Sequence, residues 1–323
     1  MNDCLTPAPD AATLRIGHSP DPDDAFMWYP LADFIGPDGR QHSPKIDTAG
    51  YRFVHVLEDI QALNERSEQA ELEITALSIH QYPYIADKYA LTSCGASMGD
   101  GYGPMLVAPQ KIDLRELVTP LANTATPAPG QRRRPRIAIP GKRTSAWLAL
   151  QLLLLEHGIR AGDDHGIDYE VVMFDQIIPA VVNGEFDAGL IIHEGQLTYA
   201  GAGLHCVVDL GAWWKETRGG LPLPLGGNAV RRDLGEQMPR ITRVLLESIR
   251  WALDHRRESV DFALNYARDM GHDLADRFVG MYVNDWTLDF GEQGRAAVRR
   301  FLGEAADAGL IPATGEVDFI EPA

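Results

Sequence analysis

The chain has 323 residues, of which 45% are hydrophobic and 23% charged, and a formal net charge of -17 at pH 7. This length and composition predict a globular protein with room for two domains, and no apolar run approaches the length of a membrane span. Nucleic acid and anionic membrane surfaces attract positive charge, so the negative charge argues against both as partners. An anionic ligand would have to be bound by local donors.

The cysteines and the N-terminal sequence indicate the compartment. Cys4, Cys94 and Cys206 are an odd number and lack the spacing of a metal site. They fit a reducing environment better than a disulfide framework. The first ten residues have neither the basic nor the apolar segment of a secretory signal. We therefore expect a cytoplasmic protein.

The first predicted strand, Leu14–His18, leads through a turn rich in serine, proline and aspartate into a helix. Ser19 or Asp21 can cap this helix, and acids are favourable at a helix N-terminus. That chemistry is enough to explain Asp21 and Asp23. Ser19 and Asp24 also lie at the carboxyl end of a strand, where ligands bind in open α/β sheets. For these two residues a structural role and a ligand-binding role both stay open.

Two further strand-to-helix corners are expected in the first third of the chain. Tyr51–Leu57 alternates as a strand does and precedes a helix with acids in its first turn. Leu72–Leu77 is the next predicted strand, and Ser78 is placed to cap the segment that follows. The glycines between positions 95 and 103 fit neither a phosphate-binding loop nor a dinucleotide-binding motif. We expect them to form a turn before the chain crosses into a second domain.

A surface insertion is expected at residues 111–134, which include a stretch rich in proline, alanine and threonine. The arginine run Arg132–Arg136 is more typical of a solvated loop than of a binding patch. The strand that begins at Arg136 then turns at a Pro-Gly corner and reaches Thr144 and Ser145, which begin a strongly helical segment. Backbone N–H groups and hydroxyls at such a corner can bind a carboxylate or a phosphate. An ordinary helix N-cap would explain Thr144 and Ser145 equally well.

Asp187–Gly195 combines a short apolar run, typical of a central strand in a parallel sheet, with a histidine where the strand ends. The imidazole of His193 is therefore expected at the edge of the sheet where ligands bind. A histidine there can accept a proton near neutral pH. The alternative is a core or edge histidine whose nitrogens bond to the backbone, and this stretch alone does not decide between the two.

Two adjacent tryptophans, Trp213 and Trp214, follow the predicted strand Leu204–Leu210. Tryptophans in such a place either pack at a domain junction or cover a flat ligand. Leu221–Asn228 is expected to be a second crossing between domains, and the pattern from Asp233 is helical almost to the end.

The order of these elements predicts an α/β fold in which one lobe interrupts the other, with a ligand cleft between them. The expected lobe I comprises residues 1–108 and 226–323, and the expected lobe II comprises residues 109–225. In this arrangement His193 and the Thr144–Ser145 corner would face the corners of lobe I across the cleft.

Several motifs of the sequence resemble those of the MqnD family, the 1,4-dihydroxy-6-naphthoate synthases of the futalosine pathway of menaquinone biosynthesis. The resemblance covers almost the whole chain. The most specific motifs are Asp187–Glu194 and the pair of Asp209–Trp214 with Leu221–Gly226. The motif His18–Met27 is less specific. The resemblance implies a periplasmic-binding-protein-like (type II) fold, in which each lobe is a mixed sheet flanked by helices.

The resemblance also implies roles for individual residues. His193 matches the family's catalytic proton acceptor, and the Thr144–Ser145 corner matches its substrate-binding pair on the second lobe. Ala76, Leu77 and Ser78 match its substrate-binding corner on the first lobe.

The chain departs from the family's usual pattern at two corners. In many members the first word reads Ser-Pro-Cys-Pro-Asn-Asp, and here Asp21 and Asp23 replace the cysteine and the asparagine. The family often has a lysine where Ala76 stands, so contacts at that corner must come from the backbone or from Ser78.

The implied reaction cleaves cyclic dehypoxanthine futalosine to 1,4-dihydroxy-6-naphthoate and releases dihydroxyacetone. His193 would be the general base, and the substrate carboxylate would rest on the helix start at Thr144–Ser145. We expect this small-molecule reaction to need neither a metal nor a redox cofactor.

Four other functions compete with this one. A chorismate dehydratase shares the fold but is not expected to share the His193 strand or the Gly211–Trp214 word. A non-catalytic protein that binds a small anion for a transporter is disfavoured because no signal sequence is visible. The ligand domain of a DNA-bound regulator is disfavoured because no basic helix-turn-helix is visible. Metal-dependent hydrolysis is disfavoured because His193–Glu194 has no second histidine at helical spacing.

Overall fold

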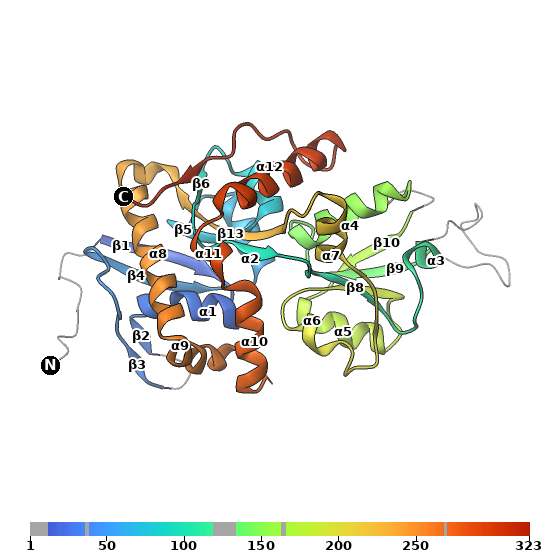
Figure 1. The fold of residues 1–323 in the computed structure, drawn as a ribbon, viewed down its shortest axis with the longest axis horizontal. Helices are drawn as coiled ribbons and strands as arrows, with labels where there is room; N and C mark the ends of the chain where they lie inside the picture. Colours follow the sequence, from blue (N-terminus) through green and yellow to red (C-terminus); the bar gives the residue numbers. More distant parts are fainter. Residues whose placement is uncertain (1–11, 36–38, 119–133, 163–165, 268–269) are drawn as a thin grey trace. The chain divides into compact units, whose positions relative to one another are not determined.

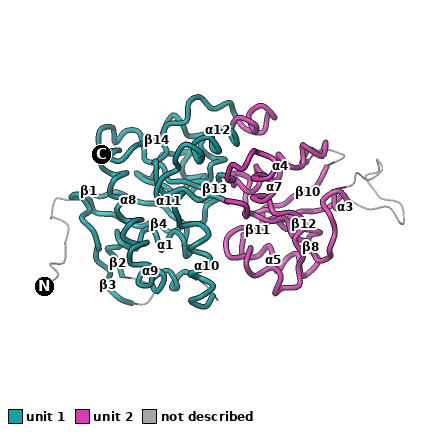
Figure 2. The backbone as a smooth tube through the Cα atoms, in the orientation of Figure 1, with its two compact units in different colours: residues 1–98, 224–302, 312–323 teal, residues 99–223, 303–311 magenta. Residues whose placement is uncertain are grey.

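The computed structural model describes residues 12–35, 39–118, 134–162, 166–267 and 270–323. The chain divides into two compact units (Figure 2). Unit 1 comprises residues 1–98, 224–302 and 312–323, and unit 2 comprises residues 99–223 and 303–311. No helix within the described ranges is long and apolar enough to cross a membrane.

Unit 1 is built on a mixed sheet with the strand order β14-β6-β13-β5-β1-β4, and β7 also pairs with β13 (Figure 1). β1 is parallel to both β4 and β5, whereas β13 is antiparallel to β5 and β6. A short hairpin of β2 (Phe34–Ile35) and β3 (Gln41–His42) lies outside this sheet. The strands of the main sheet are β1 (Ala12–His18), β4 (Tyr51–Leu57), β5 (Ile74–Ser78), β6 (Tyr89–Thr92), β7 (Ser97–Gly99), β13 (Leu223–Arg231) and β14 (Phe319–Ile320).

The helices α1, α8, α9 and α10 of unit 1 bury apolar residues in one large core. α1 packs against α8, α9 and α10 and buries Phe26 and Trp28 in the cluster that holds Ile16 and Phe53. The α-helices are α1 (Pro22–Trp28), α2 (Ile60–Ser67), α8 (Met238–Asp254), α9 (Arg256–Ala263), α10 (His272–Tyr282), α11 (Asp285–Leu288) and α12 (Gly291–Asp307). The 3-10 turns are η1 (Tyr29–Leu31), η2 (Ile79–Tyr84), η3 (Arg232–Gln237) and η4 (Leu264–Tyr266).

Unit 2 has its own mixed sheet with the order β10-β9-β11-β8-β12. β9 is parallel to β10 and β11, whereas β8 is antiparallel to β11 and β12. The helices α4 and α7 lie on one side of this sheet and α5 and α6 on the other (Figure 1). The elements are β8 (Met105–Ala108), α3 (Leu114–Val118), β9 (Arg136–Ile139), α4 (Ser145–Glu156), β10 (Asp168–Val171), α5 (Phe174–Val182), β11 (Ala188–Ile191), α6 (Gly195–Thr198), β12 (His205–Asp209) and α7 (Leu210–Thr217).

The unit boundaries differ from the predicted lobes at three places, of which the smallest is residues 224–225, which belong to unit 1. Residues 99–108 belong to unit 2, because β8 pairs with β11 and β12 there. Residues 303–311, the last part of α12 and its exit, also belong to unit 2. They are tied to it by Arg218, which pairs with Glu304, and by Arg160, which donates to the Ala308 carbonyl. Long-range pairings of this kind cannot be read from local sequence patterns.

Most of the predicted elements are present with small shifts at their ends. Tyr51–Leu57 is a strand as predicted, and the predicted helix start at Ser145 is the first residue of α4. The predicted crossing Leu221–Asn228 contains a boundary between the units, at residues 223 and 224. Most of this segment belongs to the extended strand β13, which pairs with β5 and β6 on its two sides. Of the expected insertion, residues 119–133 lie outside the described residues, and Leu114–Val118 forms α3.

Candidate active site

In each unit the predicted site residues follow strands that end at one edge of a sheet. β1 and β5 are parallel neighbours in unit 1, so Ser19 and Asp24, which follow β1, and Ser78, the last residue of β5, lie at carboxyl ends on the same edge. β9 and β11 are parallel neighbours in unit 2, so the Thr144–Ser145 corner and His193 share an edge there. Such edges are where open α/β sheets bind ligands.

The β1–α1 corner of unit 1 is a closed network of acids and a serine. The Ser19 N–H donates to Asp24 Oδ2 at 2.7 Å, and the Ser19 hydroxyl donates to Asp21 Oδ2. Asp21 occupies the N-cap position of α1 but makes no side-chain cap bond, which corrects the expectation that Ser19 or Asp21 caps the helix. Burial raises the pKa of Asp24 to about 7, and the charge of Asp21 adds to this, although the Ser19 N–H acts in the opposite direction.

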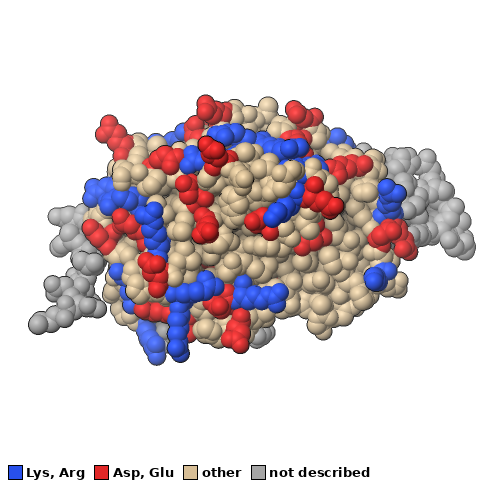
Figure 3. Space-filling view, viewed as in Figure 1, with Lys and Arg blue, Asp and Glu red and all other residues tan. Residues whose placement is uncertain are grey.

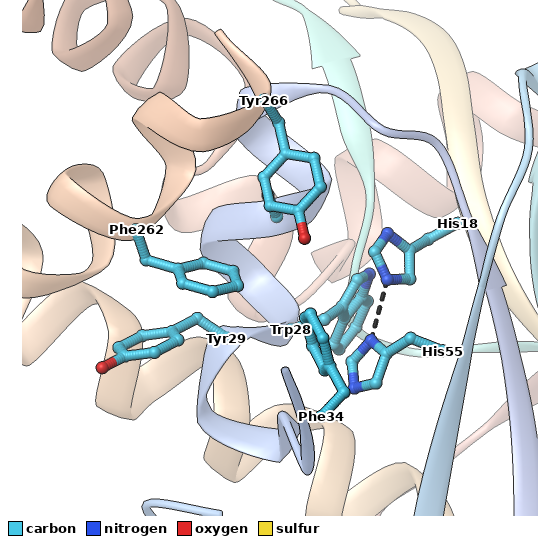
Figure 4. A pocket seen from close by; sticks show the side chains of 8 residues that line it. His18, Trp28, Tyr29, Phe34, His55, Phe262 and Tyr266 are labelled. Atoms are coloured by element: carbon cyan, nitrogen blue, oxygen red, sulfur yellow. Dashed lines mark hydrogen bonds between the residues drawn. The ribbon is translucent and has the colours of Figure 1, made fainter. Parts of the chain in front are cut away.

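A histidine pair, which the sequence analysis missed, adjoins this corner, because His18 directly precedes Ser19 (Figure 4 shows the two rings). His18 Nδ1 lies 3.1 Å from the Ser19 carbonyl oxygen, and His18 Nε2 lies 2.9 Å from His55 Nδ1. Because a carbonyl oxygen only accepts, neutral His18 carries its hydrogen on Nδ1 and accepts from His55 Nδ1. The pairing of β1 with β4 places the two rings together, in register Ile16 to His55.

Both imidazoles are neutral at physiological pH. Burial lowers the pKa of His18 to about 3 and the pKa of His55 to about 4. The aromatic rings of Trp28, Phe34 and Phe262 line a small cavity beside the pair (Figure 4). A signal for His55 was available, because the alternation in β4 puts it on the same face as the buried Tyr51 and Phe53.

At the β5 corner only one of the three predicted residues offers a polar side chain. Ala76 and Leu77 lie inside the sheet, between β1 and β13, and Leu77 is fully buried. The Ser78 N–H donates to Asn64 Oδ1 at 2.9 Å, and Asn64 Nδ2 donates to Ser78 Oγ at 3.0 Å. Ser78 therefore does not cap the following 3-10 turn as expected, because its hydroxyl is engaged by Asn64.

In unit 2 the helix α4 begins with the cap that the sequence allowed. Thr144 Oγ1 accepts from the Trp147 N–H at 3.2 Å and donates to the Gly141 carbonyl at 2.9 Å. Thr144 and Ser145 are both buried. A side-chain cap satisfies one of the four free N–H groups of a helix start, so capping and anion binding at this corner are compatible.

His193 lies in a turn between β11 and α6, with an unusual backbone conformation. Its φ is 50°, and the other non-glycine residues with positive φ in the described part of the chain are Ala49 and Ala70. The ring of Phe174 meets the imidazole edge to face, with centroids 4.8 Å apart at 61°. Strained backbone at a chemically active side chain is typical of functional sites.

The surface around α5 is poor in charge. Figure 3 shows few Lys, Arg, Asp or Glu side chains over this helix, whereas both signs are interspersed over much of the rest of the face in view. Met173, just before α5, is 56% exposed, and Val182 at its end is 51% exposed. His193 thus lies next to Phe174, the first residue of a helix over which this view shows little charge.

A family model described as menaquinone biosynthesis matches residues 14–307. The 1,4-dihydroxy-6-naphthoate synthase of Thermus thermophilus is 37% identical over 92% of this chain and 95% of its own length. The enzyme of the same name from Streptomyces coelicolor is 35% identical over 94% of this chain and 97% of its own length. The chain belongs to the MqnD family of menaquinone biosynthesis.

Solved structures confirm the predicted fold class. A protein from Archaeoglobus fulgidus is 40% identical, with a TM-score of 0.76, over 93% of this chain and 98% of its own. The ligand-binding component of an import system from Staphylococcus aureus has a TM-score of 0.65 at 13% identity, over 96% of this chain and 97% of its own. At that identity the likeness shows the fold alone, which is the periplasmic-binding-protein-like fold predicted from the sequence.

The structure explains several residues of the family motif Asp209–Trp214. Asp209 caps α7 by accepting from the Gly211 and Ala212 N–H groups, at 2.9 and 3.0 Å. A Cβ on Gly211 would lie 1.9 Å from the Tyr102 carbonyl oxygen, so only glycine fits there. Trp214 is fully buried, so of the two expected roles for this tryptophan the structure shows packing.

Trp213 is held in a polar cluster of unit 2. Its Nε1 donates to Glu156 Oε2 at 3.1 Å, and the Arg218 guanidinium lies over its ring at 4.8 Å. No group of three or more side chains able to hold a metal occurs within the described ranges.

Proposed function

We propose that this chain converts cyclic dehypoxanthine futalosine to 1,4-dihydroxy-6-naphthoate, with His193 as the general base. Two relatives named for this product match more than nine-tenths of the chain. The observation that carries the assignment of the base is the position of His193, in a strained turn at the carboxyl edge of the unit 2 sheet. The parallel neighbour of its strand leads to the start of α4 at the same edge.

The chemistry asked of this edge is proton removal and anion binding. A neutral imidazole nitrogen of His193 takes a proton from the substrate, which allows a carbon–carbon or ring bond to break and the product ring to become aromatic. Dihydroxyacetone leaves as the sugar-derived fragment. The carboxylate of the substrate rests at the Thr144–Ser145 corner, where the positive end of the twelve-residue helix α4 favours an anion.

Unit 1 contributes further proposed contacts at its own edge. Ser78 offers a hydroxyl at the end of β5, and the backbone of Ala76 and Leu77 completes the corner that the resemblance assigns to substrate. Burial raises the pKa of Asp24 to about 7, and in its protonated form Asp24 can donate a hydrogen bond that an ionised aspartate cannot. Ser19 holds Asp24 through its backbone N–H and is proposed with it.

We further propose a cytoplasmic location and a small-molecule carboxylate as the partner, with no nucleic acid. The net charge of -17 supports the exclusion of nucleic acid, because nucleic acid binds to positively charged surfaces.

The test is turnover of cyclic dehypoxanthine futalosine by the wild type and by His193→Ala, with product followed by mass. His205→Ala, an exposed histidine of the same unit, is the matched control. Product from the wild type and the control but not from His193→Ala supports both the reaction and the base. Product from all three would leave the reaction and remove His193 from it.

Failure of all three folded proteins to turn over this substrate would overturn the reaction. Conversion of chorismate by the same preparation would then indicate the sister activity, chorismate dehydratase. Binding of a small anion without conversion of either substrate would indicate a non-catalytic binding protein.

A further inference from the structure

We infer that Phe174 is a positioning residue for the imidazole of His193. The inference rests on the proposed function, in which His193 is the general base. Phe174 lies outside the sequence motifs that the chain shares with its family. It is the first residue of α5, and its ring lies edge to face against His193 with centroids 4.8 Å apart.

The backbone at His193 sets only part of the geometry. A φ of 50° fixes the direction in which the side chain leaves the chain, and the turn is held by a bond from the Gln196 N–H to the His193 carbonyl at 3.2 Å. The second side-chain torsion of a histidine is broad, so the backbone alone does not fix where the ring nitrogens point. The edge-to-face contact with Phe174 restricts that torsion.

Phe174 is itself carried by a rigid support. α5 packs so closely on β11 that a Cβ on Gly189 would lie 2.5 Å from Ile177 Cγ2 and 2.9 Å from Val181 Cγ2. β11 is the strand that ends two residues before His193. The ring that restrains the imidazole and the strand that presents it therefore belong to one packed block.

This arrangement matters because proton transfer depends on distance. A general base must lie within about 2.6–3.2 Å of the atom that gives up the proton, and a misplacement of about 1 Å can cost on the order of 100-fold in rate. Loss of the ring at position 174 should therefore slow the chemical step more than it weakens substrate binding.

The experiment compares two substitutions at this position with a control in the same core. Phe174→Leu removes the ring and keeps an apolar side chain, whereas Phe174→Tyr keeps the ring. Phe186→Leu is the control, because Phe186 is buried in the cluster that contains Ile177 and Val181 but has no ring contact with His193. We expect kcat to fall about tenfold in Phe174→Leu with KM within about twofold, and both other variants to stay within about twofold of the wild-type kcat.

Two further measurements separate a positioning role from a structural one. In the His193→Ala background, Phe174→Leu should cause no additional loss of kcat. In proton NMR spectra, the ring resonances of His193, assigned by their absence in His193→Ala, should shift in Phe174→Leu. They should stay close to their wild-type positions in Phe186→Leu.

The outcomes distinguish the inference from the proposed function. A wild-type kcat in Phe174→Leu, or unchanged His193 resonances in that variant, would overturn the inference and leave the proposed function standing. Full turnover by His193→Ala would overturn the role of His193 as the general base. The contact between Phe174 and His193 would then have no role in catalysis. The combination of a lowered kcat, rescue by tyrosine and a shifted resonance supports the inference.

Discussion

The β1–α1 corner of unit 1 and the β11–α6 corner of unit 2 both follow a strand that ends at a sheet edge, and each holds a histidine. In unit 1, His18 is buried and bonded to His55 on one side and to the Ser19 carbonyl on the other. In unit 2, His193 is half-buried, has a strained backbone and lies against one aromatic ring. A hydrogen-bonded pair inside the core stabilises a fold, whereas a residue with a strained backbone costs stability. Substitution of the histidines in the unit 1 corner should therefore lower stability more than activity. Substitution of His193 in unit 2 should lower activity more than stability.

The largest expected effect is on catalysis in unit 2. His193→Ala should lower kcat by about 10²–10⁴-fold, the usual contribution of a general base, and should change the free energy of unfolding little. Steady-state kinetics and urea unfolding of the same preparation measure both quantities. A loss of stability as large as the loss of activity would make the two corners alike and contradict the comparison.

The second effect is the dependence of unit 1 on pH. The pKa values of His18 and His55 are lowered to about 3 and 4 in the folded state, from 6.5 in the unfolded state. The unfolded chain therefore binds more protons as the pH falls below 6.5. The free energy of unfolding should drop by at most about 1.4 kcal/mol per pH unit for each histidine, and above pH 6.5 the pair should contribute no pH dependence. Urea unfolding between pH 7.5 and 4.5 measures the slope.

Asp24 should act in the opposite sense over part of this range. Its pKa is raised to about 7 in the folded state, so the folded chain binds more protons between pH 3.8 and 7, and this group costs stability as the pH rises. Asp24→Asn should remove that cost and steepen the net gain of stability with pH. An unchanged pH profile would show that Asp24 is ionised at its ordinary pKa. Full turnover and affinity in Asp24→Asn would remove it from the proposed contacts.

A third, smaller effect is the loss of the histidine pair. His55→Ala leaves His18 Nε2 without its donor and should cost about 1–3 kcal/mol of unfolding free energy. His272→Ala, at an exposed position of the same unit, is the control and should cost little. Equal unfolding midpoints for the two variants would show that the buried pair adds nothing to stability. The kcat of the folded fraction of His55→Ala should stay within about threefold of the wild type, because the pair touches no proposed reacting atom.

The smallest expected effect is the release of strain at His193. Glycine adopts positive φ freely, so His193→Gly should be more stable than His193→Ala by about 1 kcal/mol, while both keep only the low kcat expected without the base. Thermal or urea unfolding of the two variants measures the difference. If His193→Gly were the less stable of the two, the turn would not be strained at this residue.

Local patterns in the sequence were sufficient for much of the fold. The alternation of Tyr51–Leu57 and the apolar run before His193 depend on neighbours along the chain, and both form strands where expected. The N-cap at Thr144 was equally readable, because a cap bond spans only three residues. The family words pointed to the MqnD family, and one of them is now explained by the close approach of Gly211 to the backbone of Tyr102.

The tertiary structure alone decided what depends on residues far apart in the chain. The pairing of His18 with His55, the bonds between Ser78 and Asn64, and the membership of β8 in the unit 2 sheet all join segments that no local pattern links. The same holds for the side chain that flanks the proposed base, because Phe174 and His193 are brought together by the packing of α5 on β11. The sequence by itself determined the elements, the family and the candidate base. Only the tertiary structure decided which side chains surround the candidate site residues, because strand pairing and helix packing join segments that are far apart in the sequence. These neighbours in turn set the pKa values and the ring orientations.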